Sequence, residues 1–259
     1  MFPPKRTLSI WLLVFVCGLL VSGRLSAQIE QFSTPLGEKV RISLAPGWGL
    51  YSMNDLNKHY IDRFAKVAGI FEDNIDNGPT IYGEVSYVVT PNISASLGVN
   101  YLRGQLEEKS WENVVVEGEG TLAMRWERSL TTTALAPQLM VKYHFPLGDL
   151  DLFSGAGLAW CWGKSILKSD SRIPDLSTSF ITEDRFKAQG AGLLGCIGMS
   201  HDLSDKFAIG TEIGYRHFVT GDLETEGGTP WVVEYNGTSH KIKLDFSGAF
   251  LLVTLSLRL

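Results

Sequence analysis

The sequence is poor in cysteine and has no surplus of basic residues. Its three cysteines are Cys17, Cys161 and Cys196, too few for a disulfide scaffold, and no paired CxxC motif or His/Cys cluster suggests zinc. Asp and Glu outnumber Lys and Arg by 28 to 23, so the charge pattern is not that of a nucleic-acid-binding protein. We therefore expect no metal, no cofactor, no nucleic-acid partner, and free thiols at Cys161 and Cys196.

Long apolar runs are also missing, apart from a short one near the N-terminus. Lys5 and Arg6 precede the apolar stretch 10–21, and Leu25-Ser26-Ala27 offers a small-residue cleavage site. That order is typical of a secretory signal peptide, and the stretch is shorter than the about 20 residues of a membrane-spanning helix. We predict a signal peptide at 1–27 and one mature domain at 28–259. In a membrane this domain must form a closed barrel, since only helices and closed barrels satisfy the backbone in lipid.

The mature chain is dominated by alternation of apolar and other residues with period two, which is typical of β-strands. Three short separators near 91, 147 and 204 alternate with long polar separators at 54–78, 107–129, 167–185 and 222–240. This pattern predicts an all-β, antiparallel up-and-down barrel with both termini at the short-turn end. The eight strand segments are 39–53, 79–91, 93–106, 130–146, 150–166, 186–201, 206–221 and 241–259.

The two faces of these segments differ in chemistry: one is aliphatic, and the other is small, polar or charged. A soluble barrel would turn the aliphatic face inward, whereas a transmembrane barrel turns it towards lipid. We favour the transmembrane barrel because the aromatic residues of the aliphatic face fall in two bands, as they do at the two interfaces of a membrane. The bands are Trp48, Tyr101, Trp160, Trp162 and Tyr215 near the long loops, and Tyr87, Tyr143, Phe145 and Phe207 near the short turns.

The chain resembles the small eight-stranded outer-membrane barrels, the group of outer membrane proteins A (barrel domain), X and W. The signal, the eight segments and the alternating last strand 250–259 carry the resemblance. In that family the last strand ends in an aromatic residue and serves as the assembly signal, whereas here it ends in Leu259. The resemblance implies a bacterial outer membrane location with periplasmic termini, contact with outer-membrane lipid and lipopolysaccharide, assembly by the barrel-assembly machinery through the C-terminal strand, and a monomer.

Several charged residues fall on the face predicted to line the lumen. Eight strands leave an interior just wide enough for side chains to fill it, and a buried charge without a partner is costly. Two interpretations follow: a salt-bridged plug that stiffens the barrel, or a gated polar path for small solutes. The lumenal residues are Arg41, Glu84, Asn100, Gln138, Lys142, Glu212 and Arg216.

The first long loop carries apolar residues at helical spacing between Asn54 and Glu72. We predict a short helix of about four turns here. Its apolar face either covers the barrel mouth or the membrane surface, or shapes a pocket for a small apolar ligand. The residues of this face are Leu56, Tyr60, Phe64, Val67 and Phe71.

No enzymatic motif is complete. His217 lies in a stretch that faintly resembles the His-x-Ser sequence of barrel lipid A deacylases, but Val219 stands where those enzymes place the nucleophile. We therefore expect no enzyme. The leading hypothesis is a structural or passive small-molecule transport barrel. The alternative is an extracellular binding or adhesion barrel that acts through its long loops, and a lipid A-modifying enzyme is a distant third.

Overall fold

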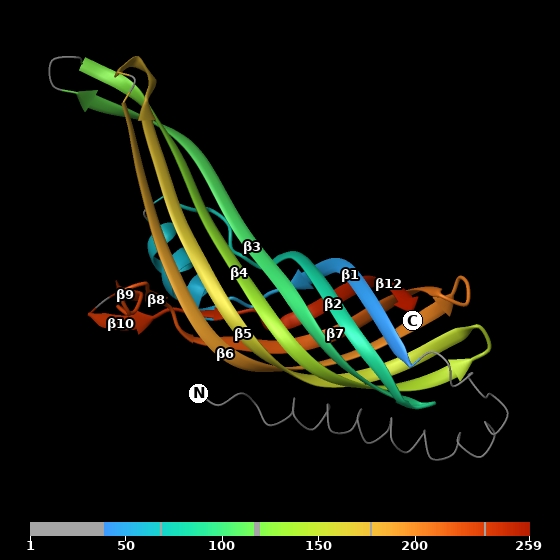
Figure 1. Cartoon of the computed structure of the whole chain (residues 1–259). Helices are drawn as coiled ribbons and strands as arrows, with labels where there is room; N and C mark the ends of the chain where they lie inside the picture. Colours follow the sequence, from blue (N-terminus) through green and yellow to red (C-terminus); the bar gives the residue numbers. More distant parts are fainter. Residues whose placement is uncertain (1–38, 68, 117–119, 177, 236) are drawn as a thin grey trace. The chain divides into compact units, whose positions relative to one another are not determined.

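The computed structural model describes residues 39–259 except 68, 117–119, 177 and 236, so the predicted signal peptide lies outside the described residues. The described chain is all-β, and its long antiparallel strands form a closed ring because β12 pairs with both β1 and β7 (Figure 1). The predicted fold class is confirmed. The ring strands are β1 (Val40–Leu50), β2 (Asn77–Thr90), β3 (Ile93–Val116), β4 (Gly120–Leu147), β5 (Leu150–Ile173), β6 (Thr178–Asp202), β7 (Phe207–Asp222) and β12 (Gly248–Arg258).

Tight turns join β2 to β3, β4 to β5 and β6 to β7 at one end of the barrel, which we call the turn end. Gly148 in the second of these turns has a φ of +63°, a left-handed conformation that glycine adopts without strain. The chain end lies here as well, since the Leu259 N–H donates to the Val40 carbonyl. The opposite end, where the longer connections gather, is the loop end.

Most described residues of the two connections predicted as polar loops, 107–129 and 167–185, belong to paired strands instead. Strands β3 and β4 stay paired as far as Val116 and Gly120, and β5 and β6 as far as Ile173 and Thr178. Strand β2 leaves β3 at Leu102, so four strands run on past the rim as a curved sheet (Figure 1). The prediction failed because polar and charged residues interrupt the apolar alternation there, and strand pairing continues without a regular apolar face to mark it.

We call this projection the extended sheet, made of residues 103–116, 120–133, 164–173 and 178–187. Its first hairpin is described as far as the pair Val116–Gly120, and its second as far as η2 (Pro174–Leu176). Residues 103–116 pair with β4 alone among the described residues, so the extended sheet has an open edge along β3.

The segment predicted as one strand at 241–259 is broken in two. Strand β11 (Lys243–Asp245) pairs with β7, the fully buried Phe246 interrupts the strand, and β12 starts at Gly248. The preceding loop holds three short strands, β8 (Glu224–Thr225), β9 (Val232–Tyr235) and β10 (Thr238–Lys241). Alternation alone did not reveal the break, because Leu244, Phe246 and Phe250 keep the period-two spacing of one apolar face. Asp245 and Ser247 between them are buried as well.

The predicted helix in the first long loop is present but shorter than expected. It is η1 (Leu56–Ala65), a π-type helix in which the Lys66 N–H donates to the carbonyl of Ile61, five residues earlier, at 2.8 Å. The chain leaves the helix through Gly69, which has a φ of +63°. No helix among the described residues is both long and apolar enough to cross a membrane.

Candidate functional site in the barrel lumen

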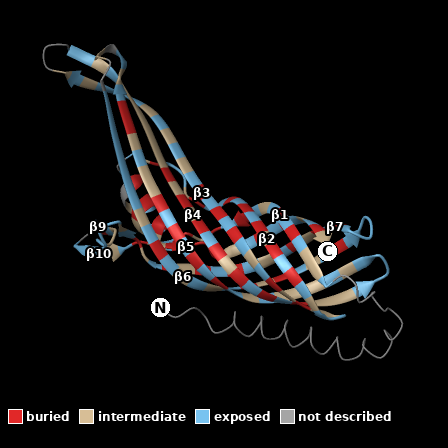
Figure 2. Ribbon diagram, in the orientation of Figure 1, coloured by how far each residue is buried: buried red, intermediate tan, exposed pale blue. Residues whose placement is uncertain are grey.

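The inward face of the barrel combines many small residues with a few long charged ones. Buried and exposed residues alternate along the strands (Figure 2), and the exposed positions of the ring are mainly aliphatic. Glycines such as Gly155 and Gly157 on β5 lie against the side chains of Lys142 and Met140, which they leave room for. All seven residues predicted to line the lumen lie on this inward face: six are buried, and Arg41 is partly exposed.

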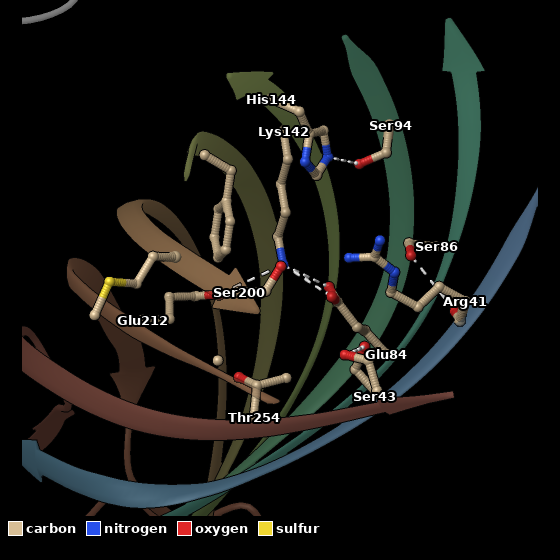
Figure 3. Close-up of a pocket in the computed structure, with 14 residues that line it drawn as sticks. Arg41, Ser43, Glu84, Ser86, Ser94, Lys142, His144, Ser200, Glu212 and Thr254 are labelled. Carbon is tan, nitrogen blue, oxygen red and sulfur yellow. Dashed lines mark hydrogen bonds and ion pairs between the residues drawn. The ribbon is translucent and has the colours of Figure 1, made fainter. Parts of the chain in front are cut away.

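Lys142 occupies the middle of the polar part of the lumen. Its Nζ lies 2.8 Å from Oε1 of Glu84 on β2 and 3.4 Å from Oε2 of Glu212 on β7 (Figure 3). The Tyr82 hydroxyl donates to Oε2 of Glu84 at 2.6 Å. Three strands are thus tied together by one buried ammonium group and two carboxylates. The charge-assisted hydrogen bonds compensate for the loss of water around these groups.

A small cavity of about 30 Å³ lies beside this cluster, on the side of the turn end. Arg41 and His144 line it, and the His144 ring contacts Ser94 Oγ at 2.8 Å (Figure 3). The other ring nitrogen of His144 lies 2.9 Å from Asp151 Oδ2. A single water needs about 10–15 Å³, so the cavity has room for only a few water molecules.

The remaining two predicted lumenal residues form local hydrogen bonds. Thr80 Oγ1 donates to Asn100 Oδ1 at 2.7 Å, and Gln138 Nε2 donates to the Met140 sulfur at 3.3 Å. Both contacts run between inward-facing side chains, on adjacent strands in the first case and along β4 in the second. These groups add to the packing of the lumen.

Arg216 differs from Lys142 because no carboxylate pairs with it among the described residues. Its side chain is fully buried, and its guanidinium lies 5.3 Å from the Tyr51 ring centre and 5.4 Å from that of Phe250. Nε donates to the Phe246 carbonyl at 3.1 Å, whereas Nη1 and Nη2 have no hydrogen-bond partner. The expectation that every lumenal charge is paired is therefore wrong for Arg216. Two aromatic rings and one carbonyl replace the acid.

The loop end of the lumen is filled by apolar side chains. Phe246 packs edge-on against Tyr51 with ring centres 5.3 Å apart. Leu56, Ile61 and Ala65 of η1 are fully buried above them, so the apolar face of the helix is used in packing at the barrel mouth.

Two members of the predicted helical face depart from it. Val67 is 81% exposed and follows the end of η1, and Phe71 is buried but lies beyond the helix. The side chain of Phe64 lies outside the described residues. Helical spacing does not hold past Ala65, because the π-type turn and Gly69 change the direction of the chain there.

An aromatic stack fastens η1 to the rest of the loop end. Trp231 packs on Phe186 of β6 with ring centres 4.3 Å apart, and on Tyr60 of η1 at 4.9 Å. Burial raises the pKa of the Tyr60 hydroxyl to about 12, which keeps it neutral. His59 stacks on His240 of β10 at 4.1 Å. Burial, and then the neighbouring His240, lower the pKa of His59.

The aromatic residues predicted to form two bands occupy outward-facing positions. Seven of them have exposed side chains, and Tyr143 and Phe145 are partly exposed and lie 4.6 Å apart. Cross-strand pairing places Tyr101 beside Leu135 and Leu135 beside Trp162, so these positions lie in one cross-strand row near the loop end.

His217 has a hydroxyl neighbour that the sequence did not suggest. Ser247 Oγ lies 3.0 Å from His217 Nδ1, although the residues are 30 positions apart. The same oxygen accepts the Phe218 N–H at 3.1 Å, and Ser247 is 3% exposed. A nucleophile must be accessible to substrate. The pair instead holds the segment before β12 against β7.

The described part of the chain was also searched for groups that could bind a metal ion and for reactive cysteines. It contains no group of three or more His, Cys, Asp or Glu residues arranged to hold a metal ion. Cys161 and Cys196 are buried free thiols, as predicted.

A closed antiparallel barrel with an aliphatic exterior and a polar interior defines a transmembrane β-barrel. The family described as "Outer membrane protein beta-barrel domain" matches residues 27–247, and the chain belongs to this family. A bacterial outer membrane location follows from that membership. A search of curated protein sequences returned no match.

Three similar solved structures are distant from this chain in sequence. A major outer membrane protein of Thermus thermophilus is 11% identical, with 85% of this chain and 99% of that chain covered and a TM-score of 0.43. Neisserial surface protein A is 9% identical, with coverage of 85% and 96% and a TM-score of 0.39. The barrel domain of Pseudomonas aeruginosa OprF is 11% identical, with coverage of 86% and 98% and a TM-score of 0.34.

Proposed function

We propose that this protein is a binding barrel: a plugged outer-membrane anchor that presents the extended sheet to the cell's surroundings. The observation that carries the proposal is the continuation of β3–β6 past the rim of a barrel whose lumen is filled. Of the two functions that the sequence left open, binding through the loop end accounts for both features. Passive transport accounts for neither.

The closed lumen supports an anchoring role. The Lys142 cluster crosses the polar half, and the aromatic and aliphatic packing around Tyr51 and Phe246 fills the other half. A solute would have to displace both layers. A stiff, filled barrel is well suited to hold a projecting sheet at a defined angle.

The extended sheet offers exposed apolar groups far from the lipid-facing band. Trp111 is 62% exposed and Val115 is 84% exposed near the tip of the first hairpin, and Phe180 is 61% exposed near the tip of the second. Exposed apolar groups among charged ones are common at sites of macromolecular contact. We place the loop end outside the cell and the termini in the periplasm, because short turns are the periplasmic feature of such barrels. In this proposal the partner is a macromolecular surface and no reaction is catalysed.

Shortened hairpins test the proposal without disturbing the barrel. Residues 109–127 and 169–182 are each replaced by Asn-Gly, which connects the cross-strand pairs Glu108–Arg128 and Lys168–Glu183 through a two-residue turn. Adhesion of expressing cells to a panel of immobilised proteins and polysaccharides is then compared with that of cells carrying the full-length chain. We expect adhesion to be lost while heat-modifiable migration of the folded barrel is unchanged. Unchanged adhesion to every surface that binds the full-length chain would contradict the proposal.

A second function, a gated path, is favoured by one observation: the guanidinium of Arg216 has two nitrogens without partners beneath the mouth. Single-channel recording in a planar bilayer separates the two functions. The binding barrel predicts no steady conductance. A conductance that appears in Tyr51→Ala/Phe246→Ala, prefers anions, and loses that preference when Arg216→Gln is added would favour the path instead.

A further inference from the structure

One cross-strand row at the foot of the extended sheet is rich in basic residues. Arg103 pairs with Thr133, Thr133 with Lys164, and Lys164 with Lys187. Because paired residues point to the same side of a sheet, all four side chains lie on the outward face. Arg103, Lys164 and Lys187 are exposed. We call this row the basic row.

The basic row has less acidic compensation than the rows further out. On the same face Arg125 pairs with Glu127, Arg172 with Asp170 at 2.6 Å, and Arg185 with Glu183 at 2.5 Å. In the basic row Arg103 donates to the neutral Gln105. Lys164 and Lys187 form no ion pair among the described residues, although Glu224 of β8 lies in register beside Lys187.

Two lysines directly opposite each other repel, and such a pair destabilises a sheet. The same-face neighbours of Lys164 are Trp162 and Ile166 on its own strand, and Thr133 and Lys187 across from it. None is acidic. An anion placed between Lys164 and Lys187 would remove the repulsion and gain two charge-assisted hydrogen bonds.

The height of the basic row indicates where this anion comes from. Lys164 follows the exposed Trp162 on the same face, about 7 Å further along the strand. Arg103 follows Tyr101 in the same way. Trp and Tyr mark the level of the membrane interface, and headgroup phosphates lie just outside the hydrocarbon.

We infer that the basic row binds the phosphate groups of an anionic lipid in the outer leaflet. This inference rests on the orientation in the proposed function, with the loop end outside. Thr133 adds a hydroxyl donor between Arg103 and Lys164. The bound lipid steadies the foot of the extended sheet on one side of the barrel.

The test uses the purified full chain in neutral phosphatidylcholine nanodiscs, titrated with bisphosphorylated lipid A and with its dephosphorylated form. A lysine near an anionic membrane surface changes affinity by about 5-fold, so Lys164→Gln/Lys187→Gln should weaken phosphorylated lipid binding about 25-fold. The matched control is Lys109→Gln/Lys168→Gln, two lysines further out on the same face, which should bind like the parent chain. Dephosphorylated lipid A should bind both double variants and the parent equally weakly.

Equal binding by the Lys164/Lys187 variant and the parent would overturn the inference, as would equal weakening in the control variant. Its failure is distinguishable from that of the proposed function, because the shortened hairpins keep Lys164 and Lys187. Loss of adhesion with normal lipid binding in the shortened chain supports both proposals. Labelling of Val115→Cys by a membrane-impermeant maleimide in intact cells checks the orientation. If Val115→Cys reacts only after permeabilisation, the proposed function fails and the basic row faces the inner leaflet.

Discussion

Lys142 on β4 and Glu212 on β7, 70 residues apart in the chain, approach to 3.4 Å across the lumen. With Glu84 they form the one polar cluster that connects strands from different sides of the described barrel. Arg216 lies on the same strand as Glu212 but is caged by aromatic rings. We therefore expect opposite effects on stability when each of the two buried cations is replaced by methionine.

Lys142→Met should be strongly destabilising. It leaves Glu84 and Glu212 buried without a cation, and removal of one partner from a buried ion pair typically costs about 3–5 kcal/mol. Denaturant unfolding in detergent micelles, followed by tryptophan fluorescence, measures the free energy of unfolding. The triple variant that adds Glu84→Gln and Glu212→Gln should recover most of the lost free energy of unfolding. Lys168→Met on the extended sheet is the neutral control. A single variant as stable as the parent would show that the cluster adds nothing.

Arg216→Met should be neutral or stabilising. Its charge is buried without an acid, so its removal relieves a desolvation cost, whereas the lost hydrogen bond to the Phe246 carbonyl contributes about 0.5–1.5 kcal/mol. The same unfolding measurement applies. A loss larger than that for Lys142→Met would mean that the cation–π contacts with Tyr51 and Phe250 outweigh the burial of the charge.

The contact between η1 and the β9–β10 hairpin should weaken in mild acid. The pKa of His59 is lowered from its ordinary 6.5, so the undocked state binds more protons between that lowered pKa and 6.5. Docking is therefore complete above about pH 6.5 and weakens as the pH falls. Lys58 and Arg63 also oppose protonation of His59, and Asp55 favours it.

Limited proteolysis or hydrogen exchange of residues 223–241 between pH 7.5 and 5 measures this docking. We expect cleavage or exchange to increase as the pH falls. His59→Gln/His240→Gln should lose the pH dependence between these values. If the double variant responds to pH as the parent does, other groups control the contact.

Gly248→Ala should destabilise the start of β12. Gly248 has a φ of +154°, and an added Cβ would lie 2.2 Å from the Leu50 carbonyl oxygen. Strain of this backbone region costs about 1–3 kcal/mol before the clash is counted. Gly148→Ala is the matched control, since its φ is +63° and nothing lies within 4 Å of an added Cβ. Urea midpoints of the two variants give the comparison, and equal midpoints would contradict the prediction.

Period-two alternation along the strand segments was enough to predict which face of each strand is aliphatic and which is polar. Because side chains alternate strictly along a strand, the pattern also placed Glu84, Lys142, Glu212 and Arg216 on the inward face. It did not predict which charge pairs with which. That depends on the stagger of strands around the closed ring, which brings Lys142 level with Glu84 and Glu212 but leaves Arg216 level with Tyr51 and Phe250.

The amino-acid sequence alone was sufficient to predict the barrel. Each strand has one side that faces lipid and one that faces the lumen, and the two sides differ in chemistry. The length of β3–β6, the break at Phe246 and the end of η1 were decided only in the folded structure. Beyond the rim, neither face of the extended sheet is regularly apolar, so hydrogen bonding between the paired strands continues without a clear pattern in the sequence. Likewise His217 and Ser247 meet only because β7 and the segment before β12 are neighbours in the closed barrel.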